Sequence, residues 1–327
     1  MLERAIAPNR FTLRAFPLPR SFADDVRDGL RKPQKELQPW YFYDSVGSAL
    51  FAAICELPEY TITRAESEIF RNNAHAIARA FGSPVRVVEL GSGDGRKTRL
   101  LLEALLARQP RLTYAPIDVD GDLLESTGRD LLASFHSLQI DAVCGDYREI
   151  TSLITSGPRT VVLFLGSSIG NLDPAGAASM LREVRSILSP HDSLFLGADL
   201  QKPKEIVERA YNDSQGVTAA FNLNLLARIN RELGGHFDLS RFAHLAFLNE
   251  QHSRIEMHLI SRERQRVAID ALEMDVDLAQ GETIHTENSY KYAPKDLETL
   301  AAEGGFAIEQ TWHDASRGFA DVLMIAH

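Results

Sequence analysis

The chain has 327 residues, of which 44% are hydrophobic and 24% are charged, an ordinary balance for a globular protein of about two domains or one elaborated α/β domain. Its formal net charge of −10 argues against nucleic acid or an anionic membrane as the main partner, because both attract basic surfaces. No apolar run reaches the roughly 18 residues that a membrane span needs. Two cysteines, Cys55 and Cys144, are too few for a disulfide scaffold, so we expect both to be reduced in a cytoplasmic protein.

The first 80 residues are expected to form an arm followed by helices. Residues 1–20 carry four arginines, but Glu3 and three prolines spoil the amphipathic helix of a transit peptide, so a partly ordered arm is expected. Thr63 followed by Glu66 has the spacing of a capping box at the start of a helix. Three helices are therefore predicted, over 21–31, 48–57 and 63–80.

A different pattern begins at Pro84, where short apolar runs alternate with amphipathic stretches. Strands are expected at 85–90, 112–119, 140–144, 160–164 and 193–200. Helices are expected at 97–107, 122–134 and 174–188. This alternation predicts a parallel sheet with helices on both faces.

After Leu200 the alternation loosens. Helices are predicted over 205–211, 217–233 and 293–303, strand-like alternation over 242–276, and a last strand over 321–325. These late strands either extend the first sheet, form a second domain, or do both.

A glycine-rich loop follows the strand at 85–90. Glu89 ends that strand, and Gly91, Gly93 and Gly95 follow with a spacing that differs from the G-x-G-x-x-G of dinucleotide sites. Glycines there let the backbone approach a ligand at a helix N-terminus. An acid at the strand tip favours a cofactor with an amino-acid tail, such as S-adenosylmethionine, although a tight turn without a ligand is as common.

Two more acids follow the next two strands. Asp118 stands where a ribose-binding carboxylate belongs, and Asp146, in Gly145-Asp146-Tyr147, is placed to accept from an adenine amino group. Taken alone, each of these acids is more often a helix N-cap than a ligand-binding group. Three acids at consecutive strand ends line the crevice where open α/β sheets bind ligands, and together they favour a nucleoside-bearing cofactor.

The chain resembles a known family, the histidine-specific Nα-methyltransferases of ergothioneine biosynthesis. The resemblance covers nearly the whole chain from about residue 20 onward. The matching stretches are YFYD at 41–44, LPEY at 57–60 with TR at 63–64, ELGSG at 89–93 with KTR at 97–99, FLGSSIGNL at 164–172, YND at 211–213, FN at 221–222, NREL at 230–233 and TENS at 286–289.

The resemblance implies an α/β fold, in which a Rossmann-like class I methyltransferase sheet is joined to a second α+β substrate-binding domain. The expected boundaries are an arm over 1–20, a helical segment over 21–80 that contributes to the substrate site, the cofactor domain over 81–200, the substrate domain over 201–315 and a final strand over 316–327 that returns to the main sheet. The same resemblance implies S-adenosylmethionine as cofactor and three methyl transfers to histidine, which yield hercynine.

The resemblance also implies roles for particular residues. Asn171 and Tyr211 correspond to the pair that holds the substrate carboxylate. Glu287 and Ser289 correspond to the pair that binds the imidazole, and their spacing places them on one face of a strand. The remaining substrate residues are the aromatic Tyr43 and Tyr60 around the amine, either of which is a candidate proton acceptor, and Met257 as a pocket wall.

The cofactor contacts that follow from the strand ends and the resemblance are Glu89, Gly91, Gly93, Lys97, Asp118, Asp146 and Tyr147. Methyl transfer from a sulfonium needs alignment and exclusion of water but no metal and no nucleophilic side chain. His252 and His258 lie six apart on a predicted strand, yet no third ligand stands nearby, so we expect no metal. Asn288, inside the imidazole-binding pair, and the extra glycines of the first loop depart from the family pattern.

Three other functions remain open from the sequence. The first is an N-methyltransferase for another amino acid such as tryptophan, whose single ring donor would use only half of the Glu287 and Ser289 pair. The second is a catalytically inactive cofactor-binding partner protein. The third, a nicotinamide oxidoreductase, is disfavoured by the loop spacing. The sequence does not decide the oligomeric state, and a monomer is favoured.

Overall fold

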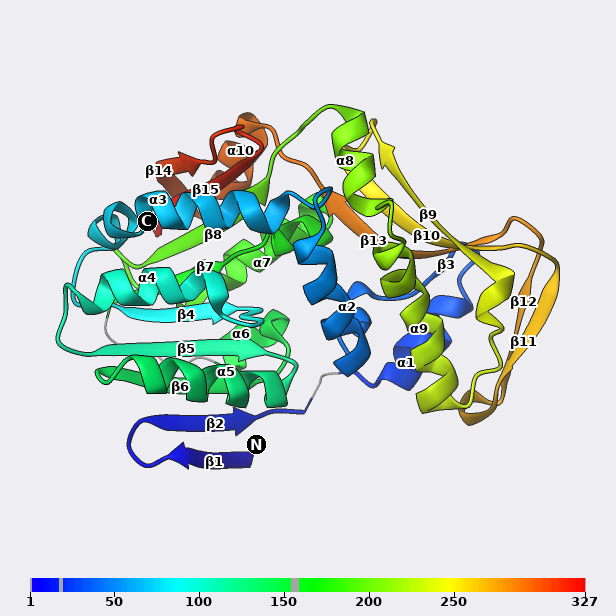
Figure 1. Ribbon diagram of the computed structural model, residues 1–327, viewed down its shortest axis with the longest axis horizontal. Helices are drawn as coiled ribbons and strands as arrows, with labels where there is room; N and C mark the ends of the chain where they lie inside the picture. Colours follow the sequence, from blue (N-terminus) through cyan, green and yellow to red (C-terminus); the bar gives the residue numbers. More distant parts are fainter. Residues whose placement is uncertain (1, 18–19, 154–158, 327) are drawn as a thin grey trace. The chain divides into compact units, whose positions relative to one another are not determined.

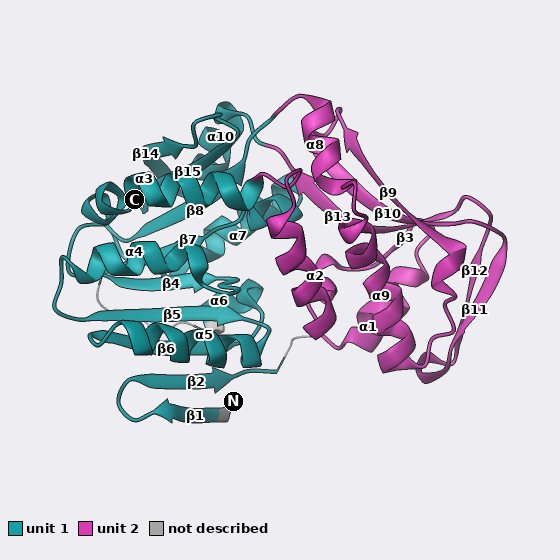
Figure 2. Ribbon diagram, viewed as in Figure 1, with its two compact units in different colours: residues 1–19, 62–201, 292–327 teal, residues 20–61, 202–291 magenta. Residues whose placement is uncertain are grey.

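The structure is a computed structural model that describes residues 2–17, 20–153 and 159–326 (Figure 1). The chain divides into two units, each assembled from separate segments (Figure 2). Unit 1 consists of residues 1–19, 62–201 and 292–327, and unit 2 of residues 20–61 and 202–291. This division differs from the expected boundaries, because the helix after residue 61 and the segment from residue 292 pack on the large sheet of unit 1.

Unit 1 is built on a nine-stranded sheet that is mainly parallel. Its strands, in spatial order, are β1 (Leu2–Ala7), β2 (Phe11–Ala15), β6 (Leu138–Cys144), β5 (Leu112–Asp118), β4 (Arg86–Leu90), β7 (Thr160–Phe164), β8 (Ser193–Asp199), β15 (Phe319–Ala326) and β14 (Phe306–His313). The strands from β2 to β8 are parallel, whereas β1, at one edge, and β15, next to β8, run antiparallel to their neighbours. The predicted α/β fold with a parallel sheet is therefore confirmed.

Helices cover both faces of this sheet, because the buried strands carry apolar residues on both sides. The elements are α3 (Ile62–Phe81), α4 (Arg96–Leu106), α5 (Gly121–Ser134), α6 (Ile150–Leu153), α7 (Pro174–Ile187) and α10 (Pro294–Gly304), with 3-10 turns η2 (Tyr147–Glu149) and η3 (Ser168–Asn171). Val88 and Leu90 of β4 join one core with α7 and α10. Glu89 between them points to the opposite face, where its carboxyl meets Thr98 of α4.

The N-terminal residues form a β-hairpin rather than the expected partly ordered arm. Strand β2 pairs in parallel with β6, and β1 adds to its outer edge. The reason is period-two burial: Phe11 and Leu13 point inward and are buried. The ring of Phe11 packs directly on Gly128 of α5, at a place where any Cβ would clash with it.

The predicted capping box at Thr63 and Glu66 is wrong. Helix α3 already begins at Ile62, so Thr63 lies inside its first turn. Glu66 is fully buried against the sheet instead of reaching back to the start of the helix. Its carboxylate accepts from the backbone N–H of Gly166 and pairs with Lys97. A buried acid needs such partners, and the sequence pattern alone does not reveal them.

Unit 2 contains a four-stranded sheet of order β3 (Lys35–Glu36), β13 (Thr283–Tyr290), β10 (Arg254–Ser261) and β9 (Phe242–Asn249), and a separate hairpin of β11 (Gln265–Ile269) and β12 (Met274–Leu278). Its helices are α1 (Phe22–Leu30), η1 (Pro39–Phe42), α2 (Ser45–Glu56), α8 (Lys204–Tyr211) and α9 (Val217–Leu233), with 3-10 turns η4 (Leu239–Arg241) and η5 (Asp270–Leu272). The late strands thus do both things that the sequence left open: β14 and β15 extend the first sheet, and the others form a second unit.

The register between β10 and β13 decides which residues share a face. Met257 lies opposite Glu287 and Ile255 opposite Ser289, so these four side chains belong to one face of the sheet. A register shift then follows, and Thr286, whose hydroxyl donates to the carbonyl of Met257, is the extra residue. Within the described part of the chain, no helix has the length and apolar character to cross a membrane.

Candidate functional site

The glycine loop of unit 1 has a backbone conformation that favours glycine at three positions. Gly91, Gly93 and Gly95 have φ values of 68°, 52° and 64°, in the left-handed region that favours glycine. Helix α4 begins directly after Gly95. A Cβ built on Gly93 would meet no atom within 4 Å, so open space lies above this residue. The loop therefore offers exposed backbone beside a helix N-terminus, which suits close approach by a ligand.

Glu89 is buried beside this loop and holds together the elements that carry it. Its side chain is 2% exposed, and its two oxygens accept from the hydroxyls of Thr98, at 2.7 Å, and Tyr114. Burial raises the pKa of Glu89 to about 7, although both hydrogen bonds and the nearby Lys97 favour the charged form. The carboxyl holds strands β4 and β5 and helix α4 together under the loop. Thr98 and Tyr114 were not among the expected site residues: Thr98 lies in a stretch that matches the family but was given no role, and Tyr114 belongs to no recognisable motif.

Asp118 ties the end of β5 to the glycine loop. One of its oxygens accepts from the backbone N–H of Gly93 at 2.9 Å, and the other from Asp120 at 3.1 Å. Burial raises the pKa of Asp118 above its usual value, whereas these hydrogen bonds lower it. The N-cap of α5 is Asp120, not Asp118. The capping alternative is therefore excluded for Asp118, which joins the tips of β4 and β5.

Asp146 and Tyr147 follow β6 on the same edge of the sheet. Asp146 caps η2 through the backbone of Arg148 and also pairs with the Arg148 guanidinium, so the capping alternative describes one of its roles. Tyr147 lies close to Gly91, whose missing Cβ would be 3.6 Å from its ring. Burial raises the pKa of Tyr147 to about 12, so its phenol stays protonated at neutral pH.

Lys97 and Asn171 occupy the same end of the sheet in unit 1. The ammonium of Lys97 forms its salt bridge with Glu66, near the backbone of Gly166 at the end of β7. Asn171 ends the 3-10 turn η3, a few residues further along the same loop. The loops after β4, β5, β6 and β7 thus bring the expected cofactor residues, together with Asn171, to one edge of the sheet.

In unit 2, Glu287, Ser289 and Met257 lie on one face of the small sheet, as their spacing predicts. Met257 and Ser289 are buried, and Glu287 is partly buried. Burial raises the pKa of Glu287 to about 7, and the positive charge of Lys291 acts in the opposite direction. This face therefore carries an acid whose charge changes near neutral pH.

A hydrogen-bonded triangle joins Ser289 to two other residues. The hydroxyl of Tyr211, at the end of α8, donates to Ser289 Oγ at 2.7 Å. The Nζ of Lys291 donates to Ser289 Oγ at 2.8 Å and to Tyr211 Oη at 3.0 Å. Lys291 was not among the site residues expected from the sequence. Its spacing from the expected pair pointed to it, because residues 287, 289 and 291 alternate along an extended chain and so share one side.

Aromatic rings line the same part of unit 2. Tyr60 lies edge-on to Tyr211 at a centroid distance of 6.4 Å, and Phe51 packs against Tyr43 at 5.5 Å and Tyr60 at 6.2 Å. Phe221 of α9 lies against Tyr43 and Phe51. Burial raises the pKa of Tyr60 well above its usual value, so its phenol keeps its proton at neutral pH. Phe51 and Phe221 extend the expected pair of tyrosines into an aromatic cluster.

His244 of β9 supports Tyr211 through the backbone. Its Nε2 lies 2.8 Å from the carbonyl oxygen of Tyr211, so Nε2 carries the proton, and Nδ1 then accepts from the amide of Asn222 at 2.9 Å. His252 lies in the turn before β10 rather than on the strand with His258. Among the described residues, no group of three or more His, Cys, Asp or Glu side chains could hold a metal ion.

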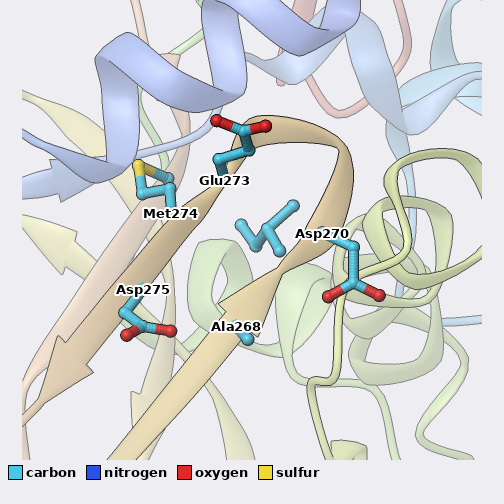
Figure 3. Close-up of a pocket in the computed structure, with 6 residues that line it drawn as sticks. Ala268, Asp270, Glu273, Met274 and Asp275 are labelled. Carbon is cyan, nitrogen blue, oxygen red and sulfur yellow. The ribbon is translucent and has the colours of Figure 1, made fainter.

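A pocket of about 340 Å³ lies on the β11–β12 hairpin of unit 2 (Figure 3). Figure 3 shows the carboxylates of Asp270, Glu273 and Asp275 spread around it, with Met274 and Ala268. None of the expected site residues lines this pocket. A cluster of acids on an exposed hairpin is most simply a solvated surface, so we do not assign it a function.

The fold and these two sets of residues define an α/β methyltransferase that uses S-adenosylmethionine: a parallel sheet with a glycine loop and acids at its carboxyl edge, and a second unit with polar groups suited to a small polar substrate. The chain belongs to the family of histidine-specific, S-adenosylmethionine-dependent methyltransferases, which it matches over residues 22–326.

Individual relatives agree with this family. The histidine N-alpha-methyltransferase of Mycolicibacterium smegmatis is 45% identical over 92% of this chain and 94% of its own length. That of Mycobacterium tuberculosis is 44% identical over 90% of this chain and 92% of its own length. The 4-dimethylallyltryptophan N-methyltransferase of Claviceps purpurea is 27% identical over 89% of this chain and 91% of its own length. The protein is thus a histidine Nα-methyltransferase by family, and one more distant relative is named for an indole amino acid.

Proposed function

We propose that the protein transfers three methyl groups from S-adenosylmethionine to the α-amino group of L-histidine in the cytoplasm, and so makes hercynine for ergothioneine biosynthesis. The observation that carries this proposal is the pairing of Glu287 and Ser289 on one face of β13, beside Met257. A ring with two nitrogens has one site for each of these two polar side chains.

The ring is recognised by complementary hydrogen bonding. A carboxylate accepts only, so Glu287 suits an imidazole N–H, and the Ser289 hydroxyl suits the other ring nitrogen. An indole would leave Ser289 without a ring partner, and a phenyl ring would leave both groups unpaired. Leaving buried polar groups unpaired is costly, so this arrangement favours histidine over both alternatives.

The backbone atoms of the substrate need separate contacts. We propose that Asn171 and Tyr211 donate to its carboxylate, since both are neutral donors. The ammonium of Lys291, 3.0 Å from Tyr211 Oη, adds positive charge on that side. A carboxylate held by hydrogen bonds from neutral and charged donors is bound more tightly than one in contact with neutral donors alone.

The aromatic cluster suits an amine that gains methyl groups. A quaternary ammonium keeps its attraction to an aromatic ring after every hydrogen bond to nitrogen has been lost. Tyr43 and Tyr60 therefore tolerate all three methylation states. Because Tyr60 keeps its phenol proton at neutral pH, we assign Tyr60 to binding and expect the amine to lose its proton to water.

For the cofactor, the open space above Gly93 and the brace from Asp118 fit a nucleoside with an amino-acid tail. We propose that Gly91 and Gly93 approach the tail, that Asp118 binds the ribose, and that Asp146 and Tyr147 lie by the adenine. S-adenosylmethionine supplies the methyl sulfonium. Glu89 acts from beneath the loop, through Thr98 and Tyr114, and Lys97 through Glu66.

A single incubation series tests this function. The protein is mixed with S-adenosylmethionine and, separately, each of the common amino acids, and product masses are recorded over time. Histidine should gain up to three methyl groups, and fragmentation should place all of them on the α-nitrogen. Methylation of tryptophan in preference to histidine, or a product that stops at one methyl group, would contradict the proposal.

A further inference from the structure

Lys291 is a buried cation at the centre of the substrate residues. Its side chain is 3% exposed, and its ammonium donates both to Ser289 Oγ and to Tyr211 Oη. It also lies over the Tyr211 ring, with Nζ 4.9 Å from the ring centroid. Burying an ammonium is unfavourable, so a lysine in this position is expected to serve a purpose beyond packing.

The direction of the hydrogen bonds follows from simple valence. An ammonium has only protons to give, so Lys291 makes Ser289 Oγ and Tyr211 Oη acceptors. Each oxygen then has its own proton left to donate. Without substrate, the Tyr211 proton is directed to Ser289 Oγ, and the Ser289 oxygen then has both lone pairs engaged. The Ser289 proton must therefore point elsewhere, away from Tyr211 and Lys291.

We propose that Lys291 is a positioning residue that sets the hydrogen-bond polarity of the histidine site. By making both hydroxyl oxygens acceptors, it directs the Tyr211 proton to the substrate carboxylate and the Ser289 proton to a ring nitrogen. The imidazole consequently binds in its neutral form, with its N–H donated to Glu287 and its other nitrogen accepting from Ser289. This inference rests on the proposed function, because it assumes that histidine is bound by these residues.

The charges around the site favour the neutral ring. The titratable groups that act electrostatically on Tyr60 are Tyr211, Cys55, Tyr43 and Glu287, and Lys291 acts on Glu287. Lys291 repels an imidazolium and attracts a carboxylate. The pKa of Glu287 is raised to about 7 by burial, so this acid is largely protonated below pH 7 and must ionise to accept the ring N–H. Histidine binding should therefore release protons in slightly acidic solution.

Calorimetric titration measures that release directly. Histidine is titrated into the protein saturated with S-adenosylhomocysteine, at pH 6.5 and pH 8, in buffers of different ionisation enthalpy. Free histidine has a ring pKa of about 6.5, so half of it must lose a proton at the lower pH. Together with Glu287, roughly one more proton should be released at pH 6.5 than at pH 8. Any release from the α-ammonium is common to the wild type and the variants, so it cancels when the proteins are compared at the same pH.

Two variants isolate the role of the charge. Lys291→Met keeps the length of the side chain but removes the ammonium, so the ring can enter as an imidazolium and each bound histidine should release about one proton fewer than in the wild type at the same pH. The Kd for histidine should rise at least tenfold, and KM should rise more than kcat falls. Lys291→Arg keeps the charge and should restore most of the proton release. If Lys291 only filled space, Lys291→Met would keep the proton release of the wild type better than Lys291→Arg.

Controls make the outcomes unambiguous. Binding of S-adenosylhomocysteine to unit 1 should be unchanged in both variants, which shows that they are folded. If Lys291→Met does not fold, Ser289→Ala takes its place. This variant should no longer release the proton that the imidazole loses on binding. Identical Kd and identical proton release at pH 6.5 in the wild type and in Lys291→Met would overturn the inference. Failure of the wild type to bind or methylate histidine would instead reject the proposed function.

Discussion

The ammonium of Lys97 forms a salt bridge with the carboxylate of Glu66, a side chain that no solvent reaches. The second oxygen of Glu66 accepts from the backbone N–H of Gly166 at 2.8 Å. Helices α3 and α4 are thereby joined to the loop that follows β7 and leads to Asn171. One buried carboxylate thus connects the cofactor loop to the loop of a proposed substrate residue.

Breaking this pair should destabilise the protein strongly. Lys97→Met leaves Glu66 buried without its cation, and the loss of one partner of a buried pair costs about 3–5 kcal/mol. Glu66→Gln with Lys97→Met should cost less than the sum of the single changes. Urea unfolding measures all three. The exposed pair of Arg266 and Asp277 is the matched control, and breaking it should change stability far less. Strict additivity of the single variants would show that the two side chains do not interact.

The cofactor assignment predicts selective stabilisation. S-adenosylmethionine and S-adenosylhomocysteine should both raise the Tm, and NAD should leave it unchanged. Asp118→Ala removes the proposed ribose contact and the acceptor for the Gly93 N–H, so the Kd for S-adenosylhomocysteine should rise roughly ten- to a hundredfold. Asp122→Ala, an exposed acid in the first turn of α5, is the control and should bind normally. An unchanged Kd in Asp118→Ala would remove this residue from the cofactor site.

The carboxylate contacts predict a loss in substrate binding rather than in turnover. A hydrogen bond to a charged group contributes about 1.5–3 kcal/mol, so Asn171→Ala should raise KM for histidine by roughly ten- to a hundredfold. Histidinamide, which lacks the negative charge, should be a poor substrate of the wild type. Steady-state kinetics with both substrates checks this. Equal kcat/KM for histidine and histidinamide would contradict the assignment of Asn171 and Tyr211.

Substrate specificity should depend on the face shared by Glu287 and Met257. Glu287→Ala removes the acceptor for the ring N–H. It should therefore lower kcat/KM for histidine and relax discrimination against larger apolar side chains. Adding Met257→Val should enlarge the space and shift the preference further towards tryptophan. The measurement is kcat/KM for both amino acids in the wild type, Glu287→Ala and the double variant. A constant ratio across these three proteins would show that this pair does not select the ring.

Glu287 should also make stability depend on pH. Its pKa is about 7 in the folded protein, above the ordinary value of about 4.3, so folding favours the protonated form. The stability that this group contributes is complete below about pH 4.3 and is lost as the pH rises to about 7. At pH 8, Glu287→Gln should therefore be more stable than the wild type, by up to roughly 3 kcal/mol.

The control for this pH effect has the opposite sign. Lys35 lowers the pKa of Glu282, so the contribution of Glu282 is present at neutral pH and is lost as the pH falls through the acidic range. Glu282→Gln should thus lower stability at pH 7 and have less effect below pH 4. Chemical unfolding of the two variants between pH 4 and pH 8 measures both trends. Parallel curves for wild type and Glu287→Gln would show that Glu287 does not titrate in this interval.

The sequence by itself determined the alternation of strands and helices between residues 85 and 200 and the chemistry at the strand ends. Alternating apolar runs predicted the parallel sheet, because a strand buried on both faces needs apolar side chains throughout. The glycines at 91, 93 and 95 predicted a loop whose backbone a ligand can approach closely, since glycine has no side chain in the way. The two-residue spacing of Glu287 and Ser289 predicted their common face. All of these are local properties, which a single stretch of chain carries.

Only the tertiary structure decided which distant groups meet. Glu66 reads as a capping residue in sequence, yet it is buried against Lys97, because the packing of α3 on α4 is set by the whole core of unit 1. The sequence predicted an arm for the N-terminal residues. In the structure β2 is a strand because β6 provides its hydrogen-bonding partners. Lys291 acquires its role only when α8 places the Tyr211 hydroxyl within 3.0 Å of its ammonium. Such pairs depend on contacts between residues far apart in the chain, and a local pattern does not say which distant residues will meet.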